Sequence, residues 1–241
     1  QYVINGTKRF ITNAPSADIL TVMARTNAEI DGAGGVSSFI VERGSSGLSF
    51  GKPEKKMGQQ GAHVCDVIFE DCRVPAENLI GLQEGQGFKT AMKVLDRGRL
   101  HLAAVCVGFA QRALDEALAY AVERKQFGQP IADFQLIQAM LADTKADIYA
   151  GRCMTIDAAR RRDEGENIST EAACAKMFTS EMCGRAVDRA VQIYGGSGYI
   201  ADHGVERMYR DARLFRLYEG TTQIQQIVIA RNMIRELRDS L

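Results

Sequence analysis

The period of the hydrophobic positions changes near residue 85. Before that point, apolar residues form short runs that glycine-rich or polar stretches separate. Short runs without helical segments between them predict β-strands in an antiparallel arrangement. The Asn5-Gly6 pair, directly after a β-branched residue, indicates a hairpin turn. Residues 1–80 therefore predict a partial antiparallel β-barrel domain. Its expected strands lie at residues 2–4, 19–23, 38–41 and 64–69.

From residue 88 onward, apolar positions recur in alternating steps of four and three, as on one face of an α-helix. Eight of the ten positions on this stripe, up to residue 120, are Phe, Leu, Met, Ala, Cys or Tyr. The same period predicts three further helices, near 135–162, 169–194 and from 222 onward. Residues 81–241 therefore predict an up-down four-helix bundle, and the whole chain predicts an α+β fold.

Residues that commonly begin helices refine these limits. Ser169 and Thr170 stand where an N-cap is expected. The segment from Thr222 to Gln225 matches a capping box, in which the first and fourth side chains bind each other's backbone. We therefore expect the last two long helices to begin at these residues.

Composition excludes several functional classes. The 241 residues carry 30 Lys and Arg against 30 Asp and Glu, so electrostatics give no support for a nucleic-acid partner. No apolar run reaches the roughly 18 residues of a membrane span, and we expect a soluble intracellular protein. Six cysteines form no CxxC pair and three histidines are scattered. We therefore expect free thiols, no disulfide framework and no metal site.

Two charged residues stand out from these patterns. Arg99 falls on the apolar stripe of the first long helix, and a buried arginine needs a carboxylate or a polar ligand. A structural pair with Asp96 and a role in ligand binding both remain open. Glu219 lies just before the last helix. It either complements the helix dipole or serves as a general base.

Several motifs, in this order and spacing, resemble the acyl-CoA dehydrogenase family over essentially the whole chain. They are YVINGTKRFITN at 2–13, KMG at 56–58, FED at 69–71, VPAEN at 74–78, GQGF at 85–88, DRGR at 96–99, RKQFG at 124–128, QIYGGSG at 192–198 and YEGTTQIQ at 218–225. The family has an N-terminal helical domain and earlier strands, so the resemblance implies the C-terminal portion of a longer enzyme. It also implies FAD, an acyl-CoA thioester substrate and dehydrogenation to a trans-2-enoyl-CoA, as in fatty-acid β-oxidation.

The resemblance gives roles to the two unusual charged residues. Glu219 matches the base that removes the α-proton, with its backbone N–H beside the thioester oxygen and Gly220 against the thioester. Some members place the base just before the arginine that matches Arg99. That position is Gly98 here, which has no carboxylate, so Glu219 is the expected base. Asp96 and Arg99 match residues that contact the acyl-CoA.

The resemblance also implies FAD contacts along the chain. Phe10 and Thr12 match the aromatic residue and the threonine beside the flavin ring. Arg124 matches a residue that reaches the FAD pyrophosphate of a neighbouring subunit. The other implied contacts are Phe127, Phe134, Gln135, Gln192, Gly196, Thr221 and Gln223. Cofactor sites shared between subunits imply a homo-oligomer, typically a tetramer.

The implied electron acceptor is an electron-transfer flavoprotein. The implied compartment is the cytoplasm for a bacterial protein and the mitochondrial matrix for a eukaryotic one. Two alternatives stay open. One is an acyl-CoA oxidase-like flavoenzyme that passes its electrons to oxygen, and the other is a non-catalytic helical oligomerisation fragment.

Overall fold

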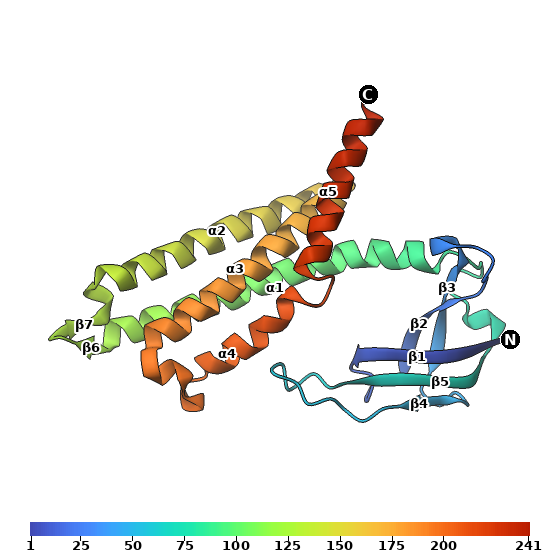
Figure 1. The fold of residues 1–241 in the computed structure, drawn as a ribbon, viewed down its shortest axis with the longest axis horizontal. Coiled ribbons are helices and arrows are strands. Elements are labelled where there is room, and N and C mark those ends of the chain that lie inside the picture. Colours follow the sequence, from blue (N-terminus) through green and yellow to red (C-terminus); the bar gives the residue numbers. More distant parts are fainter. The chain divides into compact units, whose positions relative to one another are not determined.

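The computed structural model describes all 241 residues, and it has the α+β class that the sequence predicts (Figure 1). The chain forms two compact units, Gln1–Val94 and Leu95–Leu241. Strands dominate the first unit and helices dominate the second. Each unit is described by itself below.

The first unit contains two small antiparallel sheets. In one, β5 (Val64–Val74) lies between β1 (Tyr2–Thr12) and β4 (Leu48–Phe50). In the other, β2 (Ile19–Arg25) pairs with β3 (Val36–Glu42). Residues of both sheets share one hydrophobic core, and Phe39 and Val41 of β3 are almost fully buried in it. The strands do not close into a barrel.

The hairpin expected at Asn5-Gly6 is wrong, because this pair lies inside β1. The register between β1 and β5 shifts between Ile4 and Gly6, which marks a β-bulge. Gly6 has a φ of 136°, and the Asn5 side chain accepts a 2.7 Å hydrogen bond from the backbone N–H of Asp71. The pair therefore bends a continuous strand and does not reverse the chain.

Four long helices follow, as the period predicts. They are α1 (Gly87–Glu123), α2 (Gln135–Asp163), α3 (Ser169–Tyr194) and α5 (Thr222–Asp239). Between α1 and α2, the two-residue strands β6 (Lys125–Gln126) and β7 (Gln129–Pro130) form a short hairpin. No helix combines the length and the hydropathy needed to cross a bilayer.

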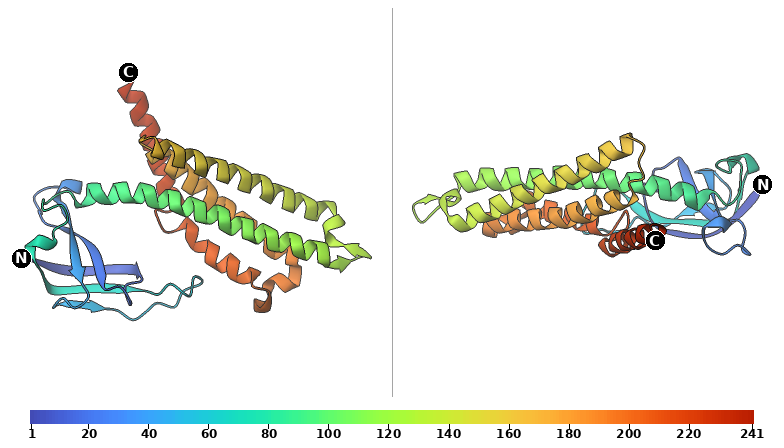
Figure 2. Two further views of the ribbon diagram at one scale, coloured as in Figure 1. Left: turned by 180° about the vertical axis from the view of Figure 1, so that it is seen from behind. Right: turned by 90° about the horizontal axis from the view of Figure 1, so that it is seen from above.

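A fifth helix, α4 (Val205–Ala212), was not expected from the sequence. Its eight residues include two glutamates or aspartates and two arginines, so its pattern is too short and polar for detection by period. The core of the helical unit contains residues of α1, α2, α3 and α4. Helix α3 packs against α2, α4 and α5, and it lies in the middle of the unit (Figures 1 and 2).

The last two long helices begin at Ser169 and Thr222, as expected, but the residues expected to cap them do not do so. The residue before α3 is Ile168, and the hydroxyls of Ser169 and Thr170 instead accept hydrogen bonds from the Asn232 side chain on α5. The N-cap of α5 is Thr221, whose hydroxyl accepts a hydrogen bond from the N–H of Ile224. Packing between α3 and α5 therefore uses side chains that the local pattern assigns to capping.

Candidate functional site

A short loop before α5 carries two successive residues in the left-handed conformation. Glu219 has a φ of 55° and Gly220 a φ of 83°. Glycine adopts this conformation at no steric cost, whereas a residue with a Cβ loses roughly 1–2 kcal/mol. Strained backbone at a charged residue points to a functional role for that residue.

The Glu219 side chain extends to α1 and meets it at Gly98. A Cβ built on Gly98 would lie 2.5 Å from Oε2 of Glu219, much closer than normal contact. Because position 98 has no side chain, the Glu219 carboxylate can lie directly against the backbone of α1. The fold brings together the two positions at which the family resemblance allows a base, and only one of them carries a carboxylate.

Polar atoms in this region are buried without partners. Oε2 of Glu219 and Nε of Arg99 are buried and form no hydrogen bond. Leaving a buried polar atom unpaired costs about 1–3 kcal/mol, so such atoms are rare outside functional sites. Both atoms are free to bind a polar group of a ligand.

Arg99 also forms the ion pair that the sequence left open. It is 7% exposed, and its Nη1 donates a 2.7 Å hydrogen bond to Oδ1 of Asp96. Burial raises the pKa of Asp96, and the neighbouring Arg99 opposes that rise. One nitrogen of Arg99 is thus paired and another is not, which allows a structural role and a binding role in the same side chain.

Two residues that sequence reasoning missed support the Glu219 loop. Lys176 on α3 has no exposed surface, and its Nζ donates a 2.6 Å hydrogen bond to the carbonyl of Gly220. Gln225 on α5 is also fully buried, and its Nε2 donates 3.0 Å hydrogen bonds to the carbonyls of Glu219 and Gly220. The signal was available for Lys176, because it follows Ala172 and Ala173 at helical spacing on an apolar face.

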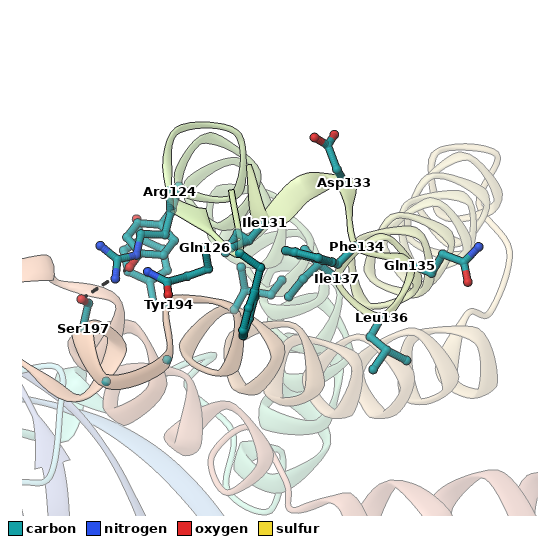
Figure 3. A pocket seen from close by; sticks show the side chains of 15 residues that line it. Arg124, Gln126, Ile131, Asp133, Phe134, Gln135, Leu136, Ile137, Tyr194 and Ser197 are labelled. Atoms are coloured by element: carbon teal, nitrogen blue, oxygen red, sulfur yellow. Dashed lines mark hydrogen bonds between the residues drawn. The ribbon is translucent and has the colours of Figure 1, made fainter. Parts of the chain in front are cut away.

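A second site lies where the β6–β7 hairpin, the start of α2 and the end of α3 meet the last turn of α1. A pocket of about 980 Å³ opens there. Figure 3 places Arg124 and Ser197 on one side of it and Phe134, Leu136 and Ile137 on the other. The pocket gathers five of the residues implied as cofactor contacts, Arg124, Phe127, Phe134, Gln135 and Gly196.

Phe127 occupies an unusual position at the tip of the hairpin. Its φ is 52° and that of Gly128 is 85°, the pattern of a type I′ turn, in which Asn is typical at the first of these positions. The Phe127 side chain is 92% exposed and lies edge-on to Phe134, with ring centroids 6.0 Å apart. A strained, exposed aromatic residue is unfavourable for stability alone, which favours a binding role.

The chemistry of this pocket suits part of a dinucleotide. Arg124 supplies an exposed cation for phosphate, Gln135 supplies an amide, and Phe127 and Phe134 supply ring surfaces. Tyr120 and Tyr194 also line the pocket and stack on each other, with ring centroids 4.0 Å apart. The donor set and the volume therefore fit a cofactor that combines phosphates with aromatic rings.

The remaining implied contacts lie elsewhere. Gln192 is exposed in the last turn of α3 and does not line the pocket. Thr221 and Gln223 belong to the start of α5, beside the Glu219 loop. Phe10 and Thr12 are exposed on β1 of the first unit, where Phe10 has a φ of 56° beside a second register shift. Phe10 is thus another strained and exposed aromatic residue.

Comparison with known proteins assigns both parts of the chain to one family. A model of the acyl-CoA dehydrogenase C-terminal domain matches residues 85–234, and a model of the middle domain matches residues 1–72. The CarC subunit of the caffeyl-CoA reductase–Etf complex of Acetobacterium woodii is 48% identical over 98% of this chain and 62% of its own length. The probable acyl-CoA dehydrogenase YngJ of Bacillus subtilis has the same identity and coverage.

Solved structures agree with these relatives. The structure of butyryl-CoA dehydrogenase from Megasphaera elsdenii has a TM-score of 0.93 and 42% identity, over 97% of this chain and 60% of that one. PigA, solved with FAD and proline, has a TM-score of 0.93 and 32% identity, over 96% of this chain and 60% of that one. The chain spans about three fifths of the length of these proteins. On the strength of both domain models and these similarities, the chain belongs to the acyl-CoA dehydrogenase family.

Proposed function

We propose that the full flavoprotein containing this chain interconverts an acyl-CoA thioester and its trans-2-enoyl-CoA, with Glu219 as the base that removes the α-proton. The observation that carries this proposal is the buried, unpartnered Oε2 of Glu219, which lies against Gly98. A carboxylate with a free oxygen at a helix surface without a side chain has both the proton-accepting capacity and the space that the reaction needs.

The residues of the chain divide the work. Glu219 accepts the proton from Cα, because an α-proton beside a thioester is only weakly acidic and needs a base held close to it. The unpaired Nε of Arg99 is available to a polar group of the acyl-CoA. FAD, when bound, supplies the acceptor for the hydride from Cβ. Arg124, Phe127, Phe134 and Gln135 are the residues of the open pocket that would hold part of this cofactor.

The direction of the reaction is a separate question that one relative raises. The similarity to a subunit of a caffeyl-CoA reductase–Etf complex supports reduction of an enoyl-CoA as a second candidate. The same name supports an electron-transfer flavoprotein as the redox partner. In the reductive direction Glu219 gives its proton back to Cα, so both directions use the same residue.

Glu219→Gln in the full flavoprotein tests the assignment. The amide keeps the shape of the side chain but accepts no proton, so we expect bound FAD and no flavin reduction by acyl-CoA. Retained turnover in a folded, FAD-loaded variant would refute the role of Glu219. Assays with acyl-CoA and oxidised electron-transfer flavoprotein, and with enoyl-CoA and the reduced form, distinguish the two directions, and peroxide formation would identify an oxidase.

The open pocket also supports an oligomer in which a neighbouring subunit contributes to each FAD site. Phe127 is almost fully exposed although it lines the pocket, so its ring is available to a neighbouring molecule. We propose a homotetramer, as is typical of the family. Light scattering of the FAD-loaded protein tests the number of subunits, and a monomer that retains FAD would contradict shared sites.

A further inference from the structure

The proposed reaction uses Glu219 but gives no task to the two buried polar side chains beneath it. A fully buried lysine is rare unless it is paired with an acid. Lys176 forms no ion pair, and its ammonium instead donates to the carbonyl of Gly220. Burying a charge for the sake of one backbone carbonyl is unfavourable for stability alone, so this contact needs another explanation.

Gln225 approaches the same piece of backbone from a different helix. Its amide nitrogen donates to two successive carbonyls, those of Glu219 and Gly220. The amide oxygen of Gln225 is buried without a hydrogen-bond partner. The hydrogen bonds of the amide nitrogen to the loop are therefore the ones that orient this side chain. Three hydrogen bonds from α3 and α5 thus converge on two carbonyls of the loop.

Those two carbonyls belong to the residues with left-handed backbone. The Cβ of Glu219 makes its conformation strained, and the hydrogen bonds are the contacts that oppose relaxation to an ordinary conformation. Gly220 leaves room for the Gln225 side chain, because a Cβ on Gly220 would lie 2.5 Å from Nε2 of Gln225. A change of backbone conformation at position 219 would redirect the side chain and carry its carboxylate away from Gly98.

We propose that Lys176 and Gln225 are positioning residues that hold the Glu219–Gly220 backbone in its strained form and thereby keep the Glu219 carboxylate at Gly98. This inference rests on the proposed role of Glu219 as the base. We call Lys176 and Gln225 the clamp residues. The inference predicts that loss of either one slows proton removal more than it weakens binding of acyl-CoA.

The test uses Lys176→Met and Gln225→Met in the full flavoprotein, since methionine keeps the length of each side chain without a donor. Thr179→Val is the control for α3, because Thr179 is equally buried but bonds only within its own helix. Gln226→Met, the exposed neighbour of Gln225, is the control for α5. FAD content, the dissociation constant for acyl-CoA and the rate of flavin reduction are measured for each variant.

Displacing a base by about an ångström costs on the order of 100-fold in rate, so we expect each clamp variant to reduce flavin about 10- to 100-fold more slowly. The dissociation constant for acyl-CoA should change less than about threefold, which is a small change in binding free energy beside the expected change in rate. Deuterium at Cα should slow the variants more than the parent, because proton removal then limits the rate. A purely structural role would not raise this isotope effect.

Wild-type rates and isotope effects in a folded, FAD-loaded clamp variant would overturn the inference. If Lys176→Met does not fold, Gln225→Met carries the same test without removing a charge. Gln225→Asn, which keeps the amide but shortens its reach, is the mildest version, and normal turnover in it would also count against the clamp. Glu219→Gln separates the two proposals: if it retains turnover, the base assignment fails, whereas an inactive Glu219→Gln with normal clamp variants refutes only the clamp.

Discussion

The Glu219 loop and the Arg124 pocket lie in the same helical unit, yet one is buried and the other is open. Around Glu219, side chains from α1, α3 and α5 of one chain converge, and several of their polar atoms are buried. Around Arg124, the side chains of Phe127 and Gln135 are exposed, and the hairpin between α1 and α2 extends into solvent. The first site is preorganised by a single chain, whereas the second offers contacts that only another molecule can complete.

After Glu219→Gln, the largest effect is expected from Gly98→Ala, which tests whether the buried site depends on the space beside Gly98. The new methyl group would displace the end of the Glu219 side chain, and we expect flavin reduction to fall about 100-fold. We expect little change in stability, because the overlap offsets the roughly 0.5–1 kcal/mol by which alanine favours a helix over glycine. Gly108→Ala on the same helix is the control, since nothing lies within 4 Å of its added methyl group. Equal activity of the two variants would contradict the contact between Gly98 and Glu219.

Arg124→Met should have the next largest effect, and it tests the open pocket. Arg124 is exposed, so its loss should leave the fold intact and weaken retention of FAD about tenfold, in line with one lost charge-assisted contact to phosphate. Flavin fluorescence during dilution measures this retention. Arg112→Met, which removes another exposed arginine of the same unit, is the control. Unchanged flavin content in Arg124→Met would exclude a phosphate contact.

The pH dependence of stability sharpens the comparison, because only the buried site contains a desolvated cation. Burial lowers the pKa of Lys176 below its usual 10.5, an effect that nearby Cys106, Glu181 and Glu219 oppose and Arg99 adds to. Between the lowered pKa and 10.5, the unfolded chain binds a proton that the folded chain does not. The free energy of unfolding should therefore rise with pH in this window, by at most about 1.4 kcal/mol per pH unit.

Below the lowered pKa the full cost of burying the ammonium is present, and it disappears as the pH rises toward 10.5. Urea denaturation of the parent and of Lys176→Met at several alkaline pH values measures the difference. The contribution should be absent from the variant, since methionine does not titrate. If the free energy of unfolding changes with pH in the same way in both proteins, burial of the Lys176 ammonium does not destabilise the fold.

The smallest effect is expected from Phe127→Asn. At this residue of the open pocket, we expect the substitution to raise the stability of the fold while it weakens cofactor binding. Asparagine accepts the left-handed conformation of the hairpin turn, so the variant should be about 1 kcal/mol more stable than the parent. We expect it to retain FAD less well, because the exposed ring is lost. Thermal melts and flavin content check both outcomes. A destabilised variant would indicate that the Phe127 ring contributes to the fold itself.

The sequence predicted the parts of this molecule that depend on period and on neighbouring residues. The stripe along α1 identified the helix and the burial of Arg99, because burial of one helix face repeats along the chain. It did not predict that Ser169 and Thr170 would bond to Asn232, or that Thr221 would replace Thr222 as the cap. These outcomes depend on side chains more than 60 residues away or on a one-residue shift, and local patterns carry no such information.

The candidate sites show the same division. Motif resemblance selected Glu219 and Arg124, but neither residue pattern nor resemblance selected Lys176 or Gln225. Lys176 lies on the apolar face of α3, and Gln225 was interpreted as part of a capping box. The position of Lys176 on an apolar face could be read from the sequence, but the hydrogen bonds of both residues to the loop exist only in the folded chain.

Helix α1 runs without interruption from the Gly98 position to the edge of the Arg124 pocket at Tyr120. Tyr120 lies 22 residues after Gly98, which corresponds to about 33 Å along the helix at 1.5 Å per residue. The helix therefore fixes both the distance between the two sites and their rotation about the helix axis. Inserting one residue would rotate one site by about 100° relative to the other. Insertions in the flanking loops carry no such penalty, so the length of this helix should be the least variable dimension of the molecule.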